Sequence, residues 1–272
     1  MNISPLERRV LAIGTAVVLH AAILGLAAAV HAAAQAAGRV PALPQGPPLL
    51  LAAVALVMAH CSLGAIWWAR SNWPSYAKTL VAVLATAALW ALLIGVLEST
   101  DLAETAAAAW AASLATQVVL VGLGAALLEL LVAPPGVAER SRFTILILLL
   151  WTAVVGVLLG AGRRLAQALG WNLADVLRWQ WFYQLQMIGV SNAALAVSLL
   201  VAVRLRREWT VRLLVAGLAL FFVGLVPPLA MTAMFKGNLG ASFADVAWLL
   251  LVQGLFVLAT LAPLEAAKEL PK

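Results

Sequence analysis

The sequence predicts an all-α membrane protein, a bundle of about eight transmembrane helices. Hydrophobic residues make up 65% of the 272-residue chain and charged residues only 10%, whereas ordinary soluble domains carry about 25% charged residues. The apolar residues are gathered into long runs, and the charged residues stand almost entirely between these runs. Since a helix needs about 20 apolar residues to cross a hydrocarbon core of about 30 Å, composition and run length lead to the same fold class.

Each apolar run predicts a helix, because the backbone polar groups of a segment in hydrocarbon have to be satisfied within that segment. The runs are too long and too rich in alanine and leucine for the strands of an outer-membrane barrel, which alternate over about ten residues. The expected helices span residues 9–32, 49–69, 79–97, 106–133, 143–161, 182–203, 211–235 and 244–264.

The first run is open to two interpretations. Arg8 and Arg9, the apolar stretch after them and the small residues 32–34 resemble a signal peptide with its cleavage site. The apolar stretch is longer than the roughly 7–15 residues of a signal peptide, and we therefore expect a membrane helix here. Cleavage would leave seven helices and would not change the orientation of the rest.

Prolines and charged residues predict local features of individual helices and of the segments between them. The proline-rich stretch 41–48 predicts an extended linker before the second helix, because proline fixes φ and removes backbone donors. Residues 172–181 mix charged and apolar side chains, which suits either an interfacial helix or an extension of the sixth helix. Pro227 and Pro228 lie inside the seventh helix and predict a kink or a break in its hydrogen bonds. Asp245 stands at the start of the eighth helix.

The basic residues orient the bundle. With eight helices, twelve lysines and arginines fall on the side that holds the N-terminus and five on the other side. The positive-inside rule then predicts a bacterial inner-membrane protein with both termini in the cytoplasm. The net charge of +6 is thus explained by orientation and lipid headgroups, and we expect no nucleic-acid partner. The bilayer is the expected partner, with other membrane proteins or a second copy of this chain as further possibilities.

The chain shows signs of a tandem duplication, with a first half of four helices at residues 1–136 and a second at 137–272. Glu7-Arg8 opens the first helix and Glu139-Arg140 the fifth, and later helices start at nearly matching offsets. Trp73 and Trp209 follow the second and sixth helices. Four crossings return the chain to its starting side, so the halves would be parallel repeats. Coincidence among similar alanine- and leucine-rich helices is the alternative.

Two apolar segments carry a family resemblance. The segment 143–155, FTILILLLWTAVV, and the segment 62–69, SLGAIWWA, resemble segments of uncharacterised multi-pass membrane proteins of planctomycete-type bacteria. Leu146 stands where those proteins usually have a basic residue. The resemblance covers about a tenth of the chain and implies no activity, cofactor or site residue.

Two histidines are candidates for cofactor binding. His20 and His60 lie near the middle of the first and second helices, and consecutive antiparallel helices would place them at similar depth. Facing imidazoles can ligate haem iron or another metal, but neutral histidine also serves as a hydrogen-bonding contact between membrane helices. No further ligand set accompanies the pair, and we therefore expect no haem, no metal and no other cofactor.

Polar residues inside the helices are candidates for a transport path. Glu129 lies in the fourth helix, where it either pairs with an arginine such as Arg140 or couples proton or cation movement. Small polar side chains usually hold membrane helices together, but they can also line a solute cavity. The other transport-path candidates are Gln117, Gln184, Asn192 and Gln253.

No motif for nucleotide binding, metalloprotease, disulfide exchange or serine hydrolase chemistry occurs. We therefore name no catalytic residue and do not expect an enzyme. The sequence favours a structural or accessory membrane protein. A small-solute transporter with a cavity between the two halves is the first alternative, and a membrane enzyme or haem protein is the second.

Overall fold

The computed structural model describes residues 5–36, 48–71, 73–98, 104–132, 182–205, 208–235 and 243–269. All regular secondary structure in these residues is helical, which confirms the predicted class. Seven helices occur in this part of the chain, and each is long and apolar enough to cross a membrane. They are α1 (Pro5–Ala36), α2 (Pro48–Arg70), α3 (Ser75–Glu98), α4 (Glu104–Val132), α7 (Phe182–Arg204), α8 (Trp209–Phe235) and α9 (Phe243–Glu269).

These helices coincide with seven of the eight predicted runs, and their ends agree with the prediction to within five residues. The largest difference is at the end of α9, which continues to Glu269 and therefore includes Glu265. The predicted helix at 143–161 and the mixed segment at 172–181 lie outside the described residues. The count of eight therefore stays a prediction.

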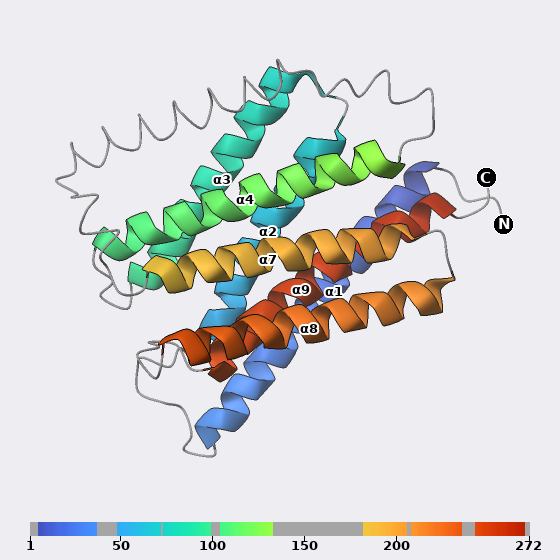
Figure 1. Ribbon diagram of the computed structural model, residues 1–272. Coiled ribbons are helices and arrows are strands. Elements are labelled where there is room, and N and C mark those ends of the chain that lie inside the picture. Colours follow the sequence, from blue (N-terminus) through green and yellow to red (C-terminus); the bar gives the residue numbers. More distant parts are fainter. Residues whose placement is uncertain are drawn as a thin grey trace.

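Four helices form the centre of the bundle, and three lie around them. α2 packs against α4, α4 against α7, α7 against α9, and α9 against α2, so that these four enclose a common core. α3 covers α2, α8 covers α7 and α9, and α1 covers α9 and α2 (Figure 1). Burial follows this arrangement, since 61% of the apolar span is buried in α7 and in α9 but only 6% in α3.

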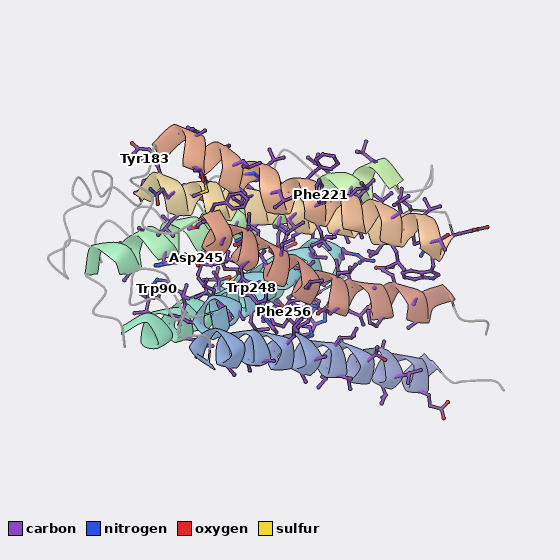
Figure 2. The ribbon with its side chains drawn as sticks, turned by 90° about the horizontal axis from the view of Figure 1, so that it is seen from below. Trp90, Tyr183, Phe221, Asp245, Trp248 and Phe256 are labelled. Carbon is purple, nitrogen blue, oxygen red and sulfur yellow. The ribbon has the colours of Figure 1, made fainter. Side chains whose placement is uncertain are left out.

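The outer helices turn large apolar side chains to the surroundings. Phe221 and Phe222 of α8 are 58% and 56% exposed, and Leu84 of α3 is 60% exposed. Figure 2 shows Phe221 on the outer surface of α8, whereas Phe256 of α9 lies inside, against α1. In water an apolar surface of this extent would be a liability. It suits a bundle surrounded by lipid.

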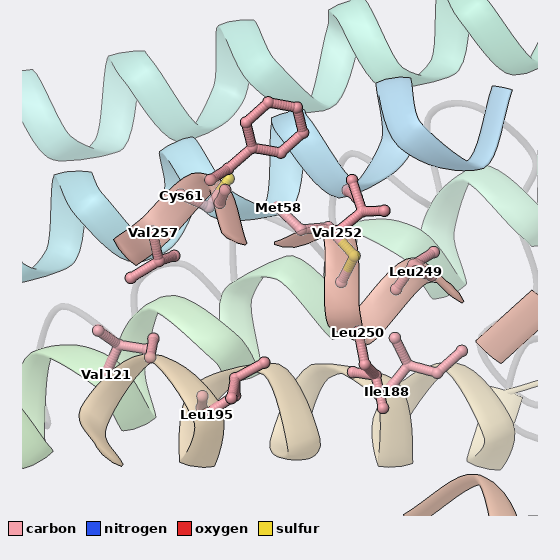
Figure 3. Packing of buried hydrophobic residues seen from close by; sticks show 14 of the residues in the cluster. Met58, Cys61, Val121, Ile188, Leu195, Leu249, Leu250, Val252 and Val257 are labelled. Carbon is pink, nitrogen blue, oxygen red and sulfur yellow. The ribbon is translucent and has the colours of Figure 1, made fainter. Parts of the chain in front are cut away.

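The core between the four central helices is apolar and closely packed. Met58, Leu195 and Phe256 are fully buried, and Figure 3 shows Met58 and Leu195 among the aliphatic side chains of the surrounding helices. Small residues bring the helices together: a Cβ atom added at Gly189 would lie 2.7 Å from the backbone oxygen of Ser113. Lipid tails are as apolar as leucine, so close contact of this kind holds membrane helices together.

α4 and α7 run in the same direction. Near their N-terminal ends the Ser113 hydroxyl donates to the Leu185 carbonyl at 2.6 Å. At their C-terminal ends Arg204 donates to Glu129 at 2.7 Å. Arg70, the last residue of α2, also contacts Glu129, at 3.1 Å. α2, α4, α7 and α9 therefore end on one side of the bundle, and α1 begins there (Figure 1).

The two prolines of α8 do not interrupt the helix. Pro227 and Pro228 lie inside α8, which continues to Phe235. The helix therefore does not break at these prolines, and the kink that the sequence also allows stays a prediction. The physical reason is that hydrocarbon offers no alternative partners to the backbone, so a membrane helix keeps the hydrogen bonds that proline leaves it.

Candidate functional site

Each of the four central helices contributes at least one fully buried polar side chain to the core, and one from each helix forms a set at the middle of the bundle. We call this set the amide cluster; it consists of Ser62 of α2, Gln117 of α4, Asn192 of α7 and Gln253 of α9, all at 0% exposure. Three of the four carry a side-chain amide, which has both donors and acceptors of hydrogen bonds. Such groups are rarely buried without hydrogen-bond partners. The hydrogen bonds that the cluster makes therefore show how much of its hydrogen-bonding capacity helix packing uses.

Met58 links two members of the amide cluster. Gln117 Nε2 donates to the Met58 carbonyl and to Ser62 Oγ, at 2.7 Å in each case. Asn192 Nδ2 lies 3.1 Å from Met58 Sδ, which is a weak acceptor. A backbone carbonyl can only accept, so the nitrogen of Gln117 has to face Met58. The amide oxygen of Gln117 is thereby turned away from this contact.

Gln253 enters the same core from α9. Leu250 and Val257, three residues before it and four after it, belong to the buried cluster that contains Leu195 (Figure 3). Residues at these spacings share one face of a helix. The neighbouring Gly254 approaches α7 so closely that an added Cβ would lie 2.9 Å from Leu195 Cδ2. Gln253 is therefore level with the part of α7 that follows Asn192.

Four atoms of the amide cluster have no hydrogen-bond partner among the described residues. They are Gln117 Oε1, Asn192 Oδ1, and both Nε2 and Oε1 of Gln253. A buried polar group without a partner costs about 1–3 kcal/mol, and a hydrocarbon environment supplies no water to offset this. Helix packing therefore accounts for only part of the cluster's hydrogen-bonding capacity.

Four charged side chains form an ion-pair network at the end of the bundle where the central helices stop. Arg204 Nη1 lies 2.7 Å from Glu129 Oε1, and Arg70 Nε lies 3.1 Å from the same oxygen. Arg70 Nη1 also lies 2.7 Å from Glu265 Oε1. The network joins α2, α4, α7 and α9. Its side chains are 12–30% exposed, so that some contact with water remains.

The glutamine of the amide cluster and the glutamate of the ion-pair network are separated by the same number of residues in α4 and in α9. Glu129 follows Gln117 by twelve residues, and Glu265 follows Gln253 by twelve. With a rise of about 1.5 Å per residue, each glutamine lies about 18 Å from the glutamate along its helix. In helices that cross a hydrocarbon core of about 30 Å, this distance would set the amide cluster near the middle of the core.

The structure separates the predicted transport-path residues. Gln117, Asn192 and Gln253 belong to the amide cluster, whereas Glu129 belongs to the ion-pair network. Gln184 is buried in the first turn of α7. It precedes Asn192 by eight residues, about 12 Å along the helix, and therefore stands apart from both groups.

Glu129 pairs with arginines, as one of the two interpretations of the sequence expects, but they are the helix-end residues Arg70 and Arg204. Arg140 lies outside the described residues. Sequence reasoning missed both helix-end arginines, Glu265 and Ser62. The repeated spacing between glutamine and glutamate is a signal that would have indicated Glu265, which lies just beyond the run predicted to end at 264.

The two intramembrane histidines meet, as their predicted depth suggests. The ring centroids of His20 and His60 are 5.8 Å apart with an interplanar angle of 64°. His20 Nδ1 lies 2.7 Å from the Ala16 carbonyl oxygen, and His60 Nδ1 lies 2.8 Å from that of Leu56. Since these oxygens only accept, the hydrogen-bond network assigns a proton to Nδ1 of each ring.

Helix α9 contacts the histidine pair through His20. The His20 ring stacks on Phe256, with centroids 5.0 Å apart, and its Nε2 lies 3.4 Å from Thr260 Oγ1. No group of three or more histidine, cysteine or acidic residues that could hold a metal ion occurs within the described segments. The contacts with α9 are those of a packed interhelical pair, which agrees with a hydrogen-bonding role.

Comparison of the chain with protein-family models, with curated proteins and with solved structures gives no match. Function is therefore inferred from the geometry of the amide cluster and the ion-pair network. The first lies deep in the core with free hydrogen-bonding capacity, and the second links the same four helices at one end.

Proposed function

We propose that this protein carries a small polar solute across a bacterial inner membrane and that the amide cluster is its solute-binding site. The observation that supports this most directly is the set of fully buried amide atoms without partners. Polar side chains that only hold helices together find partners on the neighbouring helix. Ser113, for example, donates to the Leu185 carbonyl of the neighbouring helix at 2.6 Å. Gln253 has no such bond.

A purely structural or accessory role explains Gln253 less well. Replacing a buried hydrogen-bonding group by an apolar one of the same shape is nearly neutral or stabilising. A leucine in place of Gln253 would therefore serve packing at least as well as the glutamine does. A membrane carrier, in contrast, needs polar groups near the midplane, where solute sites of transporters lie.

We further propose that residues 1–136 and 137–272 are parallel four-helix repeats. In support, α4 packs against α7 as α2 packs against α9, and the Arg204–Glu129 pair on the first contact corresponds to the Arg70–Glu265 pair on the second. α4 and α7 run in the same direction, so α4 ends on one side of the bundle and α7 begins on the opposite side. This supports the eighth crossing expected at 143–161.

The ion-pair network suits a gate at the cytoplasmic end. Arg70–Glu265 and Arg204–Glu129 each join one proposed half to the other. Passage of solute at this end would require the halves to separate and these pairs to break. Partly exposed ion pairs contribute only about 0–1 kcal/mol each, so the network can open at modest energetic cost.

Uptake into proteoliposomes tests the transport proposal. Purified protein is reconstituted, and the flux of urea, glycerol, methylammonium and sodium ions is compared with that of protein-free vesicles. We expect at least one solute to enter faster with the protein present. Gln253→Leu should reduce this flux at least about tenfold, since it removes both a donor and an acceptor from the site.

Thr86→Val is the matched control. Thr86 lies on the outer helix α3, and among the described residues its hydroxyl donates to the Ala82 carbonyl of the same helix. It should transport like the unsubstituted protein. Absence of protein-dependent flux for all four solutes, or an equal effect of both substitutions, would contradict the transport proposal and favour a structural role.

A further inference from the structure

The second half lacks the serine that holds the glutamine of the first half. In α2, Ser62 stands eight residues before Arg70 and accepts a hydrogen bond from Gln117. In α7, the residue eight positions before Arg204 is Ala196, which has no hydroxyl. The position of the serine that binds the Gln117 amide is therefore occupied by an apolar residue in α7.

The residue one turn earlier also differs. Met58 precedes Ser62 by four residues, and Asn192 precedes Ala196 by four. Gln253 is level with this part of α7, because a Cβ added to the adjacent Gly254 would lie 2.9 Å from the side chain of Leu195. The second half thus places two amides, Asn192 and Gln253, where the first half has one glutamine bound to a serine and a backbone carbonyl.

We infer that Asn192 and Gln253 bind the transported solute, whereas Gln117 is held in place by Ser62. We infer further that the solute is a small uncharged molecule rich in hydrogen-bond donors, of the class of urea-like amides and polyols. This inference rests on the proposed transport function and specifies the substrate class of the same site.

The unpartnered atoms determine the class of solute. The two solute-binding residues contribute two carbonyl oxygens, of Asn192 and Gln253, and the amide nitrogen of Gln253. Each oxygen can accept two hydrogen bonds, so acceptors exceed donors and the complementary solute is rich in N–H or O–H groups. Urea, with four N–H donors and one carbonyl acceptor, fits this pattern.

The distribution of charge favours a neutral solute. On α4 and α9, Glu129 and Glu265 lie about 18 Å from the glutamines, and Asp245 lies about 12 Å from Gln253 along α9. A charged solute at the amide cluster would have no aspartate, glutamate, lysine or arginine at its own depth among the described residues. Isolated charge in such surroundings is far more costly than a neutral hydrogen-bonding group.

Exchanging the serine between the halves tests this inference. In proteoliposomes that contain the full-length protein, Ala196→Ser supplies the missing hydroxyl, which should occupy Gln253 and compete with the solute. Urea flux should then fall about threefold to tenfold, the equivalent of one net hydrogen bond. Ser62→Ala should raise urea flux, because it frees a donor of Gln117 for the solute.

Ala202→Ser is the matched control, since Ala202 is a fully buried alanine of the same helix, six residues from Ala196 towards the ion-pair network. It should leave urea flux unchanged. An equal loss in both serine variants, or no loss in Ala196→Ser, would overturn the assignment of the binding half. If Ala196→Ser elutes as aggregate in size-exclusion chromatography, Gln253→Met replaces it: reduced urea flux is expected, and unchanged flux would overturn the assignment.

The solute panel separates this inference from the proposed function. We expect protein-dependent flux of urea or glycerol that exceeds that of methylammonium and sodium ions. Faster flux of either cation would retain transport but overturn the neutral substrate class, with the amide oxygens of Asn192 and Gln253 acting as cation ligands instead. No flux of any member of the panel would contradict the transport function itself.

Discussion

Arg204 and Glu129 form a two-point ion pair between α7 and α4, with Nη1 2.7 Å from Oε1 and Nη2 3.2 Å from Oε2. Arg70 of α2 approaches the same carboxylate at 3.1 Å. One carboxylate thus links three helices, and Arg70 extends the link to a fourth through Glu265. Parallel hydrogen bonds of this kind add geometric specificity to the pair.

Glu129→Gln should destabilise the bundle. The substitution preserves the size of the side chain but removes the charge that two partly buried arginines share. Allowing for solvent screening, we expect the free energy of unfolding to fall by about 1–2 kcal/mol, measured by titration with SDS in detergent micelles. Glu208→Gln, at an exposed position before α8, serves as control and should change it by less than about 0.5 kcal/mol. Equal effects of the two substitutions would contradict this assignment.

Gly189→Ala should loosen the contact between α4 and α7. The added Cβ would lie 2.7 Å from the backbone oxygen and 2.8 Å from the hydroxyl of Ser113, and backbone cannot move aside cheaply. We expect a loss of about 1–3 kcal/mol in the free energy of unfolding. Gly217→Ala meets no atom within 4 Å and should be neutral or slightly stabilising, because alanine favours the helix. A stable Gly189→Ala variant would show that the two helices are farther apart.

Both termini should be cytoplasmic. Among the described residues, the end of the bundle that holds Arg70 and Arg204 is the one where α1 begins (Figure 1), and an excess of basic residues marks the cytoplasmic side. Reporter fusions after residues 45 and 102 should be active in the periplasm, and a fusion at Lys272 should not. Periplasmic activity at Lys272 would rule out either eight helices or this orientation.

The histidine pair should bind no haem. His20 stacks on Phe256 and contacts the His60 ring at a centroid distance of 5.8 Å, so a macrocycle would have to force α1, α2 and α9 apart. Purified protein supplied with haem should show no Soret band of a six-coordinate complex. A Soret band that disappears in His60→Ala would prove this prediction wrong.

The two halves should superpose by rotation about an axis along the membrane normal. α2, α3 and α4 should overlay α7, α8 and α9, with Trp73 near Trp209 and Glu129 near Glu265. The first helix should overlay the fifth. An experimental density map of the whole chain provides the test. If no alignment preserves helix order within about 10 Å, one helix diameter, the repeat is a coincidence of hydropathy.

Individual elements show how much of the fold and of the candidate site the sequence predicts. The ends of α2 and α7 follow from apolar run length, because Arg70 and Arg204 terminate these runs. The transport-path candidates Gln117, Asn192 and Gln253 stand out as amides within apolar runs. Gln184 is also an amide within an apolar run, but it lies in the first turn of α7, away from the amide cluster. Residue type therefore identifies candidates, whereas depth and helix face decide which of them share a site.

The sequence by itself determined the long apolar helices of this chain, each able to cross a membrane, since hydropathy and run length are local properties of each segment. Only the tertiary structure decided which polar groups meet. Arg70 binds Glu265 across 195 residues, and Gln117 reaches Met58 across 59. Such contacts depend on the order in which helices pack and on the rotation of each helix about its axis. Nearly uniform apolar helices carry little signal for either, because lipid and protein present almost the same surroundings to an apolar side chain.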